Sequence, residues 1–175
     1  MRKYIILSIL FVMLGAVAFA QRVAYVDSEY ILKHIPEYSS AQKQLDALAE
    51  QWQKEIDVKF AEVNKMQKEY QGDRVLLTDA MKKQRETEIE KREKEAIDSQ
   101  QQRFGFQGEL FNQKIRLIKP IQDRVAKAVE DYANSESIDI IIDKSTVTLL
   151  FARSTFDGTN DIITRMGYKP GSFAK

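Results

Sequence analysis

The sequence has no cysteine, one histidine and one tryptophan, and only three prolines and seven glycines among its 175 residues. Without cysteine, disulfide bonds and thiolate ligands are excluded. The single histidine, His34, has no cysteine to join it, so ordinary zinc and Cys-His sites cannot be built, and we predict no metal site and no catalytic residue. Few helix-breaking residues combined with 30% charged residues favour long exposed helices over a compact enzyme.

Motifs for cofactor chemistry are also missing. The sequence contains no phosphate-binding glycine loop and no nucleophile elbow, so we predict no cofactor and no enzymatic activity. The formal net charge is only +1, which gives no reason to expect nucleic acid as a partner. Asp27, Asp139 and Asp143 could meet as a carboxylate cluster where strands end, although strand-end and helix-capping roles are favoured.

The first 20 residues, MRKYIILSILFVMLGAVAFA, have the pattern of a secretory signal peptide. Arg2 and Lys3 precede an apolar run, and Ala18-Phe19-Ala20 forms a small-residue cleavage site. A membrane anchor is the alternative, but the uninterrupted apolar run is short for a span of about 20 residues. We therefore predict export with cleavage after Ala20.

Two long helices are predicted in the middle of the chain, after a short strand at Val23 to Asp27 and a short helix at Ser28 to His34. Apolar residues at spacings of three or four begin at Tyr38 and continue to the break at Gly72-Asp73. A second helix is predicted from about Ala80 to Ala133. Two helices joined by a short turn lie antiparallel, so residues 38–119 are predicted to form a long helical arm.

The segment ANSESIDIIIDKSTVTLLFAR breaks the helical pattern and predicts a β-hairpin. Its strands are Ile138 to Asp143 and Val147 to Phe151, and strand Val23 to Asp27 is expected to join them. Residues 21–37 and 120–175 then form a body too small to stand alone, which predicts an α+β fold that oligomerises through its strands. The body residues assigned to this role are Val23, Tyr25, Val26, Ile138, Ile140, Ile142, Val147, Leu149 and Phe151.

Three residues are candidates for bending the arm. Gly105 and Gly108 fall inside the second predicted helix, where glycine costs about 1 kcal/mol relative to alanine. They either soften the arm or allow close helix packing, and the sequence favours neither reading. Pro120 removes a backbone donor and is predicted to kink the helix where it enters the body.

Several stretches together resemble the Skp/OmpH family of periplasmic chaperones. They are VAYVDSEYIL after the signal peptide, the charged helical hairpin, KPIQDRVAKAVEDYANSESIDIIIDKS and the closing TNDIITRM. The resemblance implies a periplasmic homotrimer whose helical arms surround a cavity that holds unfolded outer-membrane β-barrel proteins without ATP. Basic family members also attract lipopolysaccharide, whereas residues 82–103 of this chain mix both signs of charge.

On that reading, large side chains of the arm are the candidates for client contact, because an arm two helices thick cannot hide all of them. The alternative for each is a place in the seam between the helices. Two other functions stay open: a structural coiled-coil protein of the cell envelope, and an envelope factor that binds lipopolysaccharide or lipid, with weak contact to a membrane surface. The candidate client-binding residues are Trp52, Phe60, Met66, Tyr70, Phe104, Phe106 and Phe111.

The leader hypothesis predicts that the exported protein begins at Gln21, because the cleavage site follows a short apolar run. N-terminal sequencing of protein recovered from the exported fraction tests this. Retention of Met1, or recovery in the membrane fraction alone, would contradict it.

Overall fold

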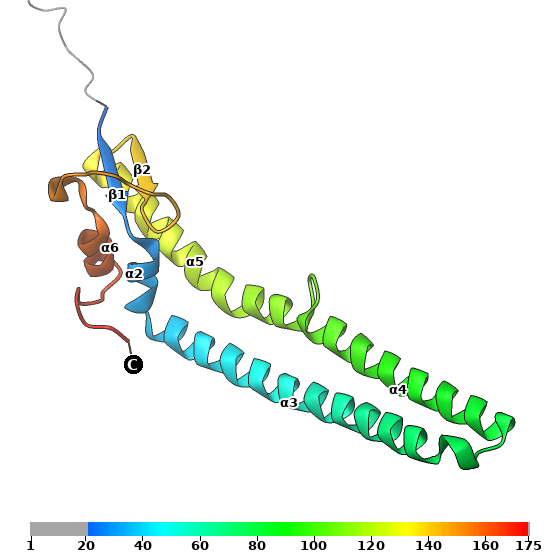
Figure 1. Cartoon of the computed structure of the whole chain (residues 1–175). Helices are drawn as coiled ribbons and strands as arrows, with labels where there is room; N and C mark the ends of the chain where they lie inside the picture. The colour runs from blue at the N-terminus through cyan, green and yellow to red at the C-terminus, as the bar shows by residue number, and fades with distance from the viewer. Residues whose placement is uncertain (1–20, 175) are drawn as a thin grey trace, which may run out of the picture.

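The computed structural model describes residues 21–174 and shows a long two-helix arm attached at one end to a small body (Figure 1). The predicted signal peptide, residues 1–20, lies outside the described residues. In the described part of the chain, no helix combines the length and hydropathy that crossing a membrane requires. The elements in chain order are β1 (Val23–Val26), α2 (Ser28–Lys33), α3 (Pro36–Asp73), η1 (Arg74–Leu76), α4 (Asp79–Phe104), α5 (Glu109–Glu136), β2 (Ile140–Asp143), η2 (Ser154–Phe156) and α6 (Thr159–Arg165).

Local sequence explains where the first helices begin. The Asp27 carboxylate accepts the backbone N–H of Tyr30 at 2.8 Å and caps α2. Pro36 occupies the start of α3, where its fixed φ suits a helix and its missing N–H costs nothing, so α3 begins two residues before the predicted Tyr38. At the far end of the arm, Thr78 caps α4 by accepting the N–H of Met81.

The arm is an antiparallel pair in which α3 runs out from the body and α4 and α5 return (Figure 1). Its register is marked by the side-chain contacts of Trp52 with Phe104 and of Tyr70 with Glu86. The predicted apolar stripe forms the seam, and alternating charge covers the rest. Buried seam residues of α3 and α4 are Ala41, Leu45, Trp52, Ile56, Val63, Ile89 and Ala96.

The predicted single helix from Ala80 to Ala133 is wrong in its middle, because a short loop separates α4 from α5. Gly105 ends α4 and Gly108 precedes α5, so neither glycine lies inside a helix. Pro120, in contrast, does lie within α5, and the helix continues through it.

The sheet has two strands, β1 and β2, which pair in parallel with Val23 opposite Ile140 and Val26 opposite Asp143. The predicted joining of the N-terminal strand to Ile138–Asp143 is confirmed, with β2 starting at Ile140. The predicted hairpin is wrong, because Val147–Phe151 is not a strand. After β2 the chain turns on the Asp143 carboxylate and crosses β1, so among residues 21–174 the segment 147–151 has no neighbouring strand to pair with.

A small core joins the sheet to the helices. Ile31, Ile35, Ile162 and Ile163 are fully buried, which places α2 and α6 against each other beneath the strands. Residues from α3 and α5 at the root of the arm extend the same cluster. The arm and the body therefore share one continuous core.

The C-terminal tail packs back over α2 around the buried side chain of His34. The Nδ1 atom lies 2.8 Å from the carbonyl oxygen of Tyr30, and Nε2 accepts the N–H of Gly171 at 3.0 Å. The Phe173 ring lies 4.8 Å from the imidazole, centroid to centroid. His34 thus acts as a structural anchor for the tail, with both ring nitrogens used by backbone groups.

The carboxylate of Asp143 ties the ends of the two strands together. It accepts the N–H of Ser28 at 3.1 Å and of Ser145 at 3.0 Å, as well as both serine hydroxyls. Partial burial raises the pKa of Asp143, but the hydrogen bonds from Ser28 and Ser145 outweigh this and hold the pKa below its usual value. The ionised form therefore stabilises the folded body.

Asp143→Asn should lower the free energy of unfolding by about 1–2 kcal/mol at neutral pH, because it replaces an ionised acceptor with an amide. Since the folded-state pKa is depressed, the contribution is present above the unfolded-state pKa and is lost as pH falls through the lowered folded-state pKa. Urea unfolding at several pH values measures this. The variant should show a shallower acid dependence than wild type, whereas Asp98→Asn, at an exposed position of α4, should not.

Candidate functional site

The two faces of the sheet differ in what covers them. Val26 is buried in the core cluster, and Ile141 packs against the same cluster. The opposite face carries apolar side chains and borders a hollow of about 330 Å³. The residues lining this hollow are Val23, Ala24, Tyr25, Ile142, Leu149, Phe151, Ala152, Arg153 and Phe156.

In β2 and in the segment that follows it, large apolar side chains are left in solvent. Leu150 is 96% exposed and Phe151 is 84% exposed, and Ile140 and Val147 are about half exposed. Among the described residues, β2 pairs only with β1, so its other edge has unpaired backbone groups. The predicted body residues therefore divide: Val26 and Ile138 belong to the core, whereas Val23, Tyr25, Ile142, Leu149 and Phe151 line the outer hollow. Leu150 belongs with the exposed set, and the sequence reasoning missed it.

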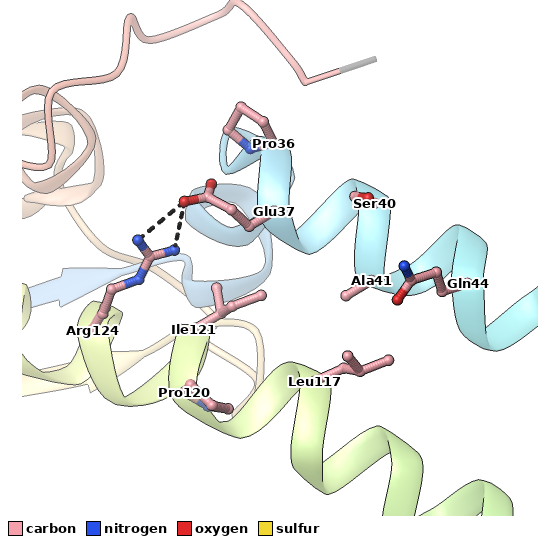
Figure 2. A pocket seen from close by; sticks show the side chains of 9 residues that line it. All are labelled: Pro36, Glu37, Ser40, Ala41, Gln44, Leu117, Pro120, Ile121 and Arg124. Carbon is pink, nitrogen blue, oxygen red and sulfur yellow. Dashed lines mark hydrogen bonds and ion pairs between the residues drawn. The ribbon is translucent and has the colours of Figure 1, made fainter.

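A second hollow, of about 720 Å³, lies at the root of the arm between α3 and α5 (Figure 2). Its apolar lining includes Ala41, Leu117 and Ile121. On its rim both terminal nitrogens of Arg124 bind Oε1 of Glu37 at 3.1 Å (Figure 2). The pKa of Glu37 is lowered, mainly by its own backbone N–H and then by Arg124. Ala41 and Ile121, one from each wall, belong to the core cluster, so the hollow lies where the arm joins the body.

The predicted client-binding residues occupy three different environments. Trp52 is buried in the seam, where the Phe104 ring approaches it edge-on at 6.4 Å and the Arg103 guanidinium lies 4.5 Å above the indole ring. Phe60, Met66, Tyr70 and Phe104 are half-buried along the same seam. Phe106 and Phe111 are exposed.

Exposed apolar residues also occur at the tip of the arm and along its sides. Val75 and Leu76 in η1 are almost fully exposed, and Ile115 follows Phe111 on α5 by one helical turn. Ile115 was not among the predicted client-binding residues. Its place outside the apolar stripe was the available signal, because an isoleucine off the buried face is left in solvent.

The three aspartates singled out from the sequence each make a local structural contact in the described part of the chain. Asp27 caps α2, Asp139 accepts the N–H of Arg22 at 2.8 Å, and Asp143 holds Ser28 and Ser145. Residues 21–174 contain no group of three or more histidine and acidic side chains placed to hold a metal ion. The favoured capping and strand-end roles of these aspartates are confirmed.

The long two-helix arm and the small body define an α+β fold in which apolar side chains remain exposed on both parts. The chain belongs to the OmpH-like outer membrane protein family, whose model matches residues 22–166. This confirms the resemblance drawn from the sequence.

A solved structure shares the fold. It comes from Caulobacter crescentus CB15 and is described as a proposed outer membrane chaperone (OmpH-like), and it aligns with a TM-score of 0.63 and 12% sequence identity. The alignment covers 89% of this chain and 90% of the Caulobacter chain. A search of curated proteins found no match.

Proposed function

We propose that this protein is an ATP-independent holdase chaperone of the periplasm that binds unfolded outer-membrane β-barrel proteins. The observation that carries the proposal is a long arm of mixed charge on which phenylalanine and other large apolar side chains remain in solvent. Unfolded barrel strands expose alternating apolar residues and unpaired edges, and they aggregate unless they are kept apart. Membership of the OmpH-like family and the proposed role of the Caulobacter protein support this assignment.

The body serves, on this proposal, to gather several arms into a homotrimer around a cavity. An unpaired β2 edge beside an apolar outer face needs a partner in water, and a second and third copy supply one. Residues 147–151 retain the alternation of a strand, so they can pair once a neighbouring copy provides an edge. The trimeric order rests on the family resemblance, and the need for partners rests on the exposed face.

Grip on a client comes from many weak apolar and charge contacts spread along the arms. The sequence has no nucleotide-binding motif to drive a cycle of binding and release, so the client stays mobile and leaves by exchange. Because the net charge is near zero, moderate salt should weaken binding only modestly. A protein with a strongly basic surface would instead lose most of its affinity for the client in moderate salt.

Ile140→Asp tests the assembly surface, because it places a charge on the outer face of β2 where a neighbour would bury it. We expect the variant to dissociate to monomers at micromolar concentration while remaining helical. Light scattering gives the mass and circular dichroism the helix content. Ile97→Asp is the matched control, since Ile97 is 47% exposed on α4 and Ile140 is 49% exposed. A monomeric wild type would refute the proposed assembly.

Shortening the arm tests where client protection lies. Residues 56–69 of α3 and 88–101 of α4 are equal in length and lie opposite each other, so removing both keeps the seam in register. The shortened protein should keep its oligomeric mass and lose most of its ability to prevent aggregation of a denatured barrel protein. Full protection by the shortened protein would place the activity in the body, and no protection by wild type would refute the holdase proposal.

A further inference from the structure

The loop between α4 and α5 is extruded from what is otherwise one continuous helix. It projects from the side of the arm away from α3, and the chain keeps its direction across it (Figure 1). Glu109 binds both Arg103 and Gln102, six and seven residues earlier in the sequence. Such pairs normally form between residues three or four apart on a helix. The chain therefore carries about three residues that the helix path does not use.

This loop has a defined shape. A Cβ at Gly105 would lie 2.3 Å from the carbonyl oxygen of Gln101, and one at Gly108 would lie 2.9 Å from two backbone oxygens. Gln107 adopts a φ of 55°, and its carbonyl accepts the Asn112 side chain at 3.0 Å. A side chain at either position would therefore collide with the backbone, so glycine allows a close backbone approach at both ends of the loop.

At its apex the loop displays Phe106, which is 97% exposed. Asn112 ties the loop to the first turn of α5, where Phe111 is 48% exposed and Ile115, one turn further, is 44% exposed. Phe111 and Ile115 share one helix face at a spacing of about 6 Å. Alternate residues of an extended strand repeat at about 6.7 Å, so two of them can contact this pair together.

We propose that Phe106, Phe111 and Ile115 form a row that binds alternating apolar residues of an extended, unfolded barrel strand. The inference rests on the proposed holdase function and names the element that makes the contact. A folded partner would bury about 800 Å² of surface on each side, whereas polar Gln107 and Glu109 separate Phe106 from Phe111 along the chain. A small apolar row of three side chains suits a client held by weak contacts that are repeated along the arms.

The test uses two row variants, Phe106→Ser alone and Phe111→Ser combined with Ile115→Ser. The control is Val58→Ser, which removes a side chain that is 60% exposed on α3. The probes are a denatured barrel protein and two peptides of equal composition, one with leucine at every second position and one with leucines at helical spacing. Each row variant should bind the barrel protein and the alternating peptide about five- to tenfold more weakly. The Val58→Ser control should bind like wild type. The peptide with leucine at every second position should bind wild type more tightly than the peptide with leucines at helical spacing.

A second variant removes the loop while sparing the arm. Deleting residues 105–107 and changing Gly108→Ala makes Arg103 and Gln102 three and four residues from Glu109, so the helix should run on with unchanged helicity and weaker client binding. A photoreactive phenylalanine at position 106 should crosslink to the client. Wild-type affinity in both row variants, or crosslinks to a second copy alone, would overturn this inference and leave the holdase proposal standing. Failure of wild type to bind any probe would refute both.

Discussion

Everything in this molecule depends on the parallel pairing of β1 with β2, because these strands flank the entire helical arm. The N–H of Arg22 reaches the carboxylate of Asp139 across 117 residues of sequence, and the register carries on from Val23 to Val26. Parallel strands need a crossover connection, and here that connection is the arm itself. The pairing fixes the ends of α3 and α5 nearest the body to one core. This fixed base lets the arm project from the body as a unit.

The helices were predictable from the sequence, because apolar residues at spacings of three or four recur over many turns. The stripe from Ala41 to Val63 is buried as predicted, and Thr78 caps α4. The extruded loop was not predictable from spacing, since apolar positions recur on both sides of Gly105 as they would on one helix. The prediction of a strand at residues 147–151 was wrong for a different reason. Alternating apolar residues fit the side-chain pattern of a strand, but a strand also needs a neighbouring strand edge to pair with.

The candidate contact residues show the same division. Trp52 and Phe106 are both large aromatic side chains of the arm, and composition alone treats them alike. The seam buries Trp52 against Phe104, while the loop carries Phe106 into solvent. Telling them apart requires the phase of each residue relative to the partner helix, and for Phe106 it also requires the backbone path between two glycines. Which large side chains are exposed can therefore be determined only when the tertiary arrangement is known.

The closure of the sheet across the whole arm also sets the order in which the protein can fold. The contacts between α3 and α4 join residues that are close in sequence near the tip, so the arm can zip from its turn toward the body. β1 is synthesised first, but its pairing strand β2 is synthesised only after the whole arm. The apolar residues of β1 therefore remain exposed to solvent until β2 is available. Folding of the body is therefore a late event, and a chain cut short before Ile140 would have an arm with no sheet at its root.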